Sequence, residues 1–165
     1  MRRATIGCIL LALLAAPALS QQRPRPPEKP VRLNLYIDDE PVDFHSRVME
    51  KNIPALVVEG QPMLPARLFD EALRDHLDLH LWAWKIVQLG RRGGGNPLAL
   101  KLGERVAYRE AAGTGGGTVE AIELPIAPRV IDSHLYLPAL PTLGELGHSA
   151  KWDAQGRTLR IMTGD

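Results

Sequence analysis

One ten-residue phrase occurs twice in this chain, at residues 57–66 and again 73 positions later at residues 130–139. The first copy reads Val-Val-Glu-Gly-Gln-Pro-Met-Leu-Pro-Ala and the second reads Val-Ile-Asp-Ser-His-Leu-Tyr-Leu-Pro-Ala. Each copy has two β-branched apolar residues, an acidic turn and an apolar approach to Leu-Pro-Ala, after which apolar residues follow at helical spacing. A repeat of strand, turn, strand and short helix predicts a scaffold built by duplication.

The positions of turn residues and the alternation of apolar residues predict many short strands and two short helices. We expect helices over residues 65–73 and 141–146, and a long strand over residues 76–89. Shorter strands are expected at 33–37, 53–58, 98–102, 106–108, 128–131, 135–137 and 158–162. This pattern predicts an α+β fold dominated by antiparallel sheet. It contains two pseudo-repeats, at about 31–95 and 96–163, each made of short strands or hairpins with one short helix.

The first 30 residues are expected to lie outside that domain. Arg2 and Arg3, the apolar run at 6–16 and the small residues of Ala-Leu-Ser at 18–20 are typical of a signal peptide over residues 1–20. Cleavage after Ser20 would export the chain to the periplasm or the extracellular space, with no membrane span left. Residues 21–30 contain four prolines and predict an extended tether. The domain itself is expected over residues 31–163.

The charge and cysteine content narrow the possible functions. Losing Arg2 and Arg3 lowers the number of Lys and Arg residues from 20 to 18 against 19 acidic residues, so the mature net charge is −1. A nearly neutral chain gives no electrostatic basis for binding nucleic acid. Cys8 is the only cysteine and leaves with the signal peptide, which excludes a disulfide and thiolate chemistry in the mature chain.

The sharpest candidate for a metal site is the alternating set His76, Asp78 and His80. On a strand these three side chains share one face, and imidazole and carboxylate groups can bind Zn²⁺ or Cu²⁺. However, five strand residues span about 13 Å, which is too far for one ion to reach both histidines. On a helix the two histidines would lie together. Because the neighbouring leucines alternate as in a strand, we predict no bound metal and no cofactor.

The tryptophans and the Ser-His neighbours are the other candidate groups. Trp82 and Trp84 are possible ligand-contact aromatics, whereas Trp152 is expected in the core. Ser and His are adjacent in sequence three times, at 45–46, 133–134 and 148–149. Adjacent side chains usually point apart, and the chain has no Gly-x-Ser-x-Gly motif, so no catalytic residues are predicted.

The second phrase continues into Trp152-Asp153 and the return Gly156-Arg157-Thr158. With these residues the chain, from about 31 to 162, resembles the copper amine oxidase N-terminal domain, a stalk-like module of exported bacterial proteins. The first copy has Arg67 after Pro-Ala, as that family favours, while the second has Leu140. The resemblance implies a five-stranded twisted antiparallel sheet cradling a helix. It does not imply oxidase chemistry, since in whole copper amine oxidases the copper ligands lie in a separate catalytic domain.

Two functional hypotheses follow from the sequence. The first is an exported, non-catalytic structural or interaction module of the cell envelope or extracellular space, whose partner is an envelope protein or a polysaccharide. The alternative is a small exported metal-binding protein or metal-assisted hydrolase that uses His76, Asp78 and His80. We predict the first, and therefore that the protein is not an enzyme.

Overall fold

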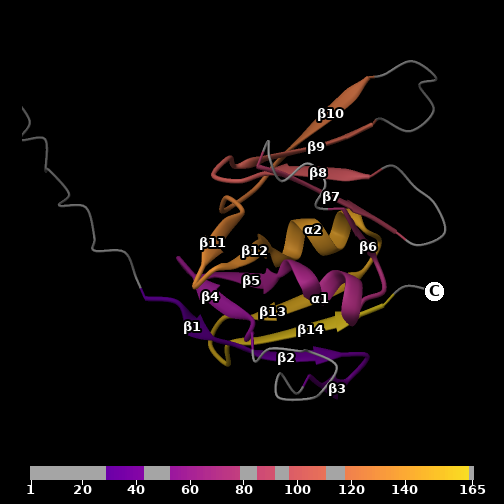
Figure 1. Ribbon diagram of the computed structural model, residues 1–165. Coiled ribbons are helices and arrows are strands. Elements are labelled where there is room, and N and C mark those ends of the chain that lie inside the picture. Colours follow the sequence, from indigo (N-terminus) through magenta and orange to yellow (C-terminus); the bar gives the residue numbers. More distant parts are fainter. Residues whose placement is uncertain (1–28, 43–52, 79–84, 92–96, 111–117, 164–165) are drawn as a thin grey trace, which may run out of the picture.

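The computed structural model describes residues 29–42, 53–78, 85–91, 97–110 and 118–163. Within these ranges the chain is mostly antiparallel β-sheet with two short helices, which confirms the β-dominated fold expected from the sequence (Figure 1). No helix in the described ranges has the length and apolar character needed to cross a membrane.

The strands form three sheets. The central sheet has the order β1 (Val31–Arg32), β4 (Leu56–Val58), β5 (Gln61–Pro65), β12 (His134–Pro138) and β11 (Arg129–Ile131). The outer sheet has the order β10 (Val119–Glu123), β9 (Val106–Glu110), β8 (Leu98–Lys101), β7 (Ile86–Gly90) and β6 (His76–Asp78). The terminal sheet has the order β13 (Ser149–Asp153), β14 (Thr158–Met162), β2 (Asn34–Ile37) and β3 (Glu40–Pro41).

The two copies of the repeated phrase form the two hairpins of the central sheet. β4 and β5 are joined by Glu59 and Gly60, whose φ angles are 51° and 75°. β11 and β12 are joined by Asp132 and Ser133, whose φ angles are 47° and 67°. Two successive residues with positive φ are typical of the type I′ turn, which matches the right-handed twist of paired strands.

The two hairpins meet along β5 and β12, at the middle of the central sheet. Leu64 pairs directly with Leu137, and both side chains are completely buried. These leucines occupy the same place in the two copies of the phrase. The repeated sequence therefore forms the contact between its own two copies, and the sheet is continuous across them.

Each hairpin leads directly into a helix. Pro65 and Pro138 both have a φ of −62° in the extended region and stand at the N-terminal ends of α1 (Ala66–Glu71) and α2 (Ala139–Glu145). α2 begins two residues earlier than expected and includes Pro141 in its first turn. A proline is tolerated there because the first N–H groups of a helix have no partner within the helix. Gly147, with a φ of 80°, follows the end of α2 as expected.

The helices connect the two copies. α1 contacts β12 as well as β5, and α2 contacts β5 and β13. Each helix thus packs against a strand from the other copy of the phrase.

The central sheet separates a large core from a small one. Leu64 and Leu137 face the large core, which contains Phe69 and Leu143 of the helices and Leu159 of the terminal sheet. The small core lies on the opposite face, because neighbouring strand residues alternate between faces. Its buried members are Ile53, Leu56, Val58, Met63, Ile126 and Tyr136.

The terminal sheet brings the beginning of the domain next to its end. β2 runs parallel to β14, the one parallel pair among the described strands. The Thr163 amide and hydroxyl donate hydrogen bonds of 2.8 Å and 2.6 Å to the Asp38 carboxylate, and these bonds lower the pKa of Asp38. The Arg160 guanidinium lies 4.5 Å from the centre of the Tyr36 ring. Polar contacts therefore reinforce the parallel pairing.

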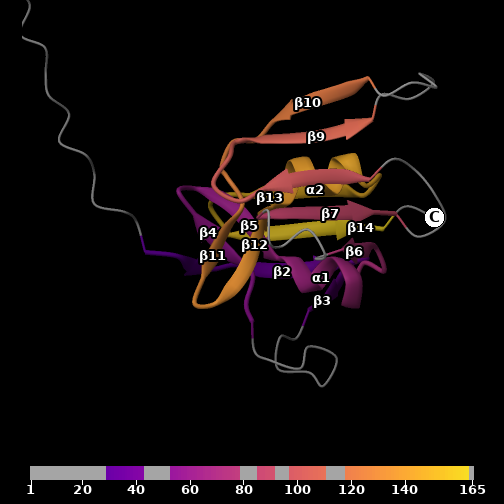
Figure 2. The same ribbon diagram turned by 45° about the horizontal axis from the view of Figure 1, so that its top comes forward.

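Two expectations differ from the structure. Residues 76–89 do not form one long strand, because β6 and β7 are antiparallel partners with His76 opposite Gly90. Lys85, with a φ of 59°, lies just before β7, and alternating apolar residues look the same along a continuous strand and along a hairpin that folds back. The resemblance implied one five-stranded sheet cradling a helix, whereas the described residues form three sheets with two helices. Figures 1 and 2 both show β10 on the outermost edge, away from the helices.

Candidate functional site

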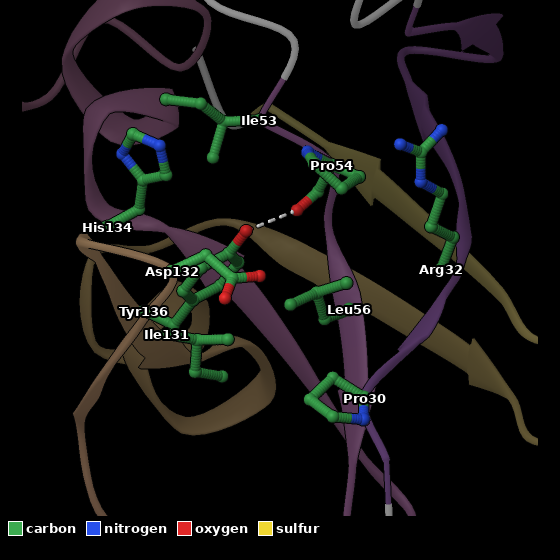
Figure 3. A pocket seen from close by; sticks show the side chains of 9 residues that line it. All are labelled: Pro30, Arg32, Ile53, Pro54, Leu56, Ile131, Asp132, His134 and Tyr136. Atoms are coloured by element: carbon green, nitrogen blue, oxygen red, sulfur yellow. Dashed lines mark hydrogen bonds between the residues drawn. The ribbon is translucent and has the colours of Figure 1, made fainter.

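A pocket of about 390 Å³ opens on the small-core face of the central sheet (Figure 3). Its walls come from β1, from the segment that precedes β4, and from the β11–β12 hairpin. The lining residues are Pro30, Arg32, Ile53, Pro54, Leu56, Ile131, Asp132, His134 and Tyr136. The volume lies at the small end of the range for ligand pockets, which is about 300–1,000 Å³.

The floor of the pocket is apolar and belongs to the small core. Ile53 and Leu56 are buried there, and Ile131 packs against them. The register places Arg32 directly opposite Leu56 on the neighbouring strand, so both lie on the same face of the sheet. The strand pairing that builds the central sheet therefore also brings a charged side chain to the edge of an apolar floor.

Tyr136 holds one wall of the pocket in place. Its hydroxyl donates a hydrogen bond of 2.9 Å to the carbonyl of Pro54, which fixes the segment before β4 against β12. Burial, followed by the negative charge of Asp132, raises the pKa of Tyr136 to about 12, while the charge of Arg32 acts in the opposite direction. Tyr136 therefore stays protonated at neutral pH, and both charged groups lie close enough to influence its hydroxyl.

Three ionisable side chains stand at the rim without partners. Arg32, Asp132 and His134 form no side-chain hydrogen bond or ion pair with another residue in the part of the chain that the structure describes. The nearby Arg129 is different, since it pairs with Glu59 at 3.0 Å. In Figure 3, Arg32 lies on one side of the pocket and His134 on the other. The site therefore presents opposite charges on either side of an apolar floor.

A second polar feature, the pair of Asp75 and His148, is closed to solvent. The Asp75 Oδ2 and His148 Nε2 atoms are 2.9 Å apart, and the side chains are 2% and 4% exposed. His148 Nδ1 and the hydroxyl of Thr142 are buried without a hydrogen-bond partner in the described residues. An acid–base pair enclosed in this way has no access to substrate, so its role is in folding.

The candidates predicted from sequence are only partly described. His76 and Asp78 lie on β6, opposite Gly90 and Gln88, and the strand expected at their positions is confirmed for the backbone of residues 76–78. His80, Trp82 and Trp84 lie outside the described residues. Within the described ranges no group of three His, Cys, Asp or Glu side chains is arranged to hold a metal ion.

The Ser-His neighbours follow the expected geometry where they are described. His148 is buried and Ser149 is exposed, so their side chains point in different directions. Ser133 is exposed in the turn, while His134 lines the pocket. The pair at 45–46 lies outside the described residues.

Comparisons with protein-family models, with curated proteins and with solved structures gave no match to this chain.

Sequence reasoning did not find the pocket. Asp132 was interpreted as a turn residue and Arg32 as part of an exposed strand end. These two residues are 100 positions apart, and only the pairing of β1 with β4 and of β5 with β12 brings them to one face. The unusual signal was an acidic residue and a histidine flanking a hairpin turn, which is too common to predict a site.

Proposed function

We propose that this chain is an exported, non-catalytic interaction module, of the kind represented by the copper amine oxidase N-terminal domain, and that it acts by binding a partner at the Arg32–Asp132 pocket. The observation that supports this most directly is the contrast between two polar sites. The pocket opens to solvent with unpaired charges, whereas the Asp75–His148 pair is enclosed. An open site without a nucleophile beside an oriented base favours binding over catalysis.

We also infer that the scaffold arose by duplication. β4 and β11 begin and end 73 residues apart, as do β5 and β12, and the helices begin at equivalent alanines. The order β13-β14-β2-β3 in the terminal sheet corresponds to β6-β7-β9-β10 in the outer sheet, with β8 inserted. β7 and β9 both run antiparallel to β8 and hence parallel to each other, as β14 and β2 do.

Binding at the pocket can be tested with a panel of small probes. The panel contains a carboxylate, an amine, a neutral aromatic and a disaccharide, and the readout is the NMR amide shifts of the purified full domain. We expect at least one probe to shift residues 131–134 and Leu56 while remaining chemically unchanged. The proposal is wrong if no probe shifts these residues, or if a probe is converted and Asp132→Asn abolishes the conversion.

Export is tested separately. Mass spectrometry of the protein collected from outside the cytoplasm should show a chain that begins at Gln21. An intact chain that begins at Met1 and stays in the cytoplasm would contradict the export part of the proposal.

A further inference from the structure

The charges at the pocket are arranged as a pair of separate ends. Arg32 enters from β1, and Asp132 enters from the tip of the β11–β12 hairpin, with Leu56 and Tyr136 between them in the close view (Figure 3). Both side chains are exposed, so each can contact a ligand without first being desolvated. Neither is neutralised by another described residue, although Glu59, on the hairpin between them in the sheet, pairs with Arg129 and Arg105.

The apolar floor between these ends is fixed. Ile53 and Leu56 are 5% and 7% exposed, and the hydrogen bond from Tyr136 to Pro54 prevents the wall from closing onto them. Because the Tyr136 hydroxyl is already engaged, the polar recognition at this site falls to the rim. A ligand that satisfies the whole site has one negative end, one positive end and an apolar body.

We propose that the pocket binds a short apolar peptide by its two free ends, with the C-terminal carboxylate at Arg32, the N-terminal ammonium at Asp132, and the side chains on Ile53, Leu56 and Ile131. This inference rests on the proposed function, because it names the class of ligand for the same pocket. An arginine is well suited to the carboxylate, since its planar group donates two parallel hydrogen bonds.

The size and charge of the site distinguish this ligand from others. A volume of about 390 Å³ suits a molecule of two or three residues. A ligand with one charge would leave either Arg32 or Asp132 without a partner. A sugar would place hydroxyl groups over Leu56 and Ile131, where no described side chain offers them a hydrogen bond. The imidazole of His134, on the Asp132 side, can hydrogen-bond the first peptide group.

The experiment is calorimetric titration of the full domain with four forms of leucyl-leucine: unmodified, N-acetylated, C-amidated and blocked at both ends. We expect the unmodified dipeptide to bind most tightly. Each block should weaken binding by about tenfold, the size of one hydrogen bond to a charged group.

The protein variants assign each end of the ligand. Asp132→Asn should abolish the difference between the free and the acetylated peptide but keep the effect of the amide. Arg32→Gln should do the reverse. Glu123→Gln and Lys151→Gln, exposed charges on β10 and β13, are the matched controls and should leave all four affinities unchanged.

Equal binding of the four peptides, or no binding of any, overturns the inference whatever the variants do. If the peptides fail while another probe of the NMR panel shifts residues 131–134, the interaction function stands and the peptide assignment is wrong. If nothing shifts those residues, both proposals fail.

Discussion

Asp75 and His148 occupy the same place after the two copies of the repeated phrase, nine residues beyond Ala66 and Ala139, and they bind each other. Each follows a residue with positive φ, Arg74 at 59° and Gly147 at 80°. The two helix ends are therefore joined by a hydrogen-bonded pair of equivalent residues, buried from solvent.

Removing one member of this pair should destabilise the fold strongly. In Asp75→Ala the His148 ring would keep both nitrogens buried without a partner, since Nδ1 already has none among the described residues. We expect a loss of about 3–5 kcal/mol in the free energy of unfolding, measured by urea denaturation.

The double variant Asp75→Leu with His148→Leu provides the control. Because it leaves no polar group unpaired, it should lose less than the sum of the single leucine variants. Additive losses would show that the two residues do not act as a pair.

The two halves of the domain should fold only together. Leu64 and Leu137 are buried against each other, and α1 and α2 each contact a strand of the other copy. A half of about 65 residues is marginal for burying its own core. Fragments 31–95 and 96–165 should therefore show no cooperative melting by circular dichroism when separate. Melting of each fragment at the temperature of the whole domain would contradict this expectation.

Tyr136 should make the domain sensitive to alkaline pH. Its pKa is raised to about 12 in the folded state, above the ordinary value of 10.0, so the unfolded chain loses this proton first. The stabilisation is complete below pH 10 and is lost as the pH rises through 12, with a total loss of about 2 kcal/mol. Denaturation curves at pH 9 and pH 12 measure it. Tyr136→Phe should reduce this pH dependence, and an unchanged slope would exclude Tyr136 as its cause.

Trp152 contributes to the core less than a fully buried tryptophan. It is half-buried, packs against the large core and pairs with Leu159 across β13 and β14. One side lines a shallow cavity of about 240 Å³ with Lys151, Asp153, Thr158 and Arg160. We expect Trp152→Ala to lower the free energy of unfolding by about 2 kcal/mol, below the 3–5 kcal/mol typical of complete burial. A change under about 0.5 kcal/mol would remove Trp152 from the core.

The purified domain should hold no stoichiometric metal and show no amine oxidase activity. Elemental analysis after dialysis against zinc and copper measures the first, and hydrogen peroxide release from primary amines measures the second. One tightly bound metal ion that is lost in both His76→Ala and His80→Ala would instead support the metal-binding alternative.

The sequence by itself determined the local structure. Hairpin turns at residues 59–60 and 132–133, helices after Pro65 and Pro138, and the return at 153–158 are all encoded by neighbouring residues, because turn chemistry and capping act over a few positions. Alternation alone did not separate the β6–β7 hairpin from a long strand.

The tertiary structure decided which distant residues meet. The pairing of Leu64 with Leu137, the contact of Asp75 with His148, and the opposition of Arg32 and Asp132 across a pocket join positions 73 to 100 residues apart. These contacts depend on strand order and register, which arise when several apolar faces are buried at once, and no local pattern records that choice.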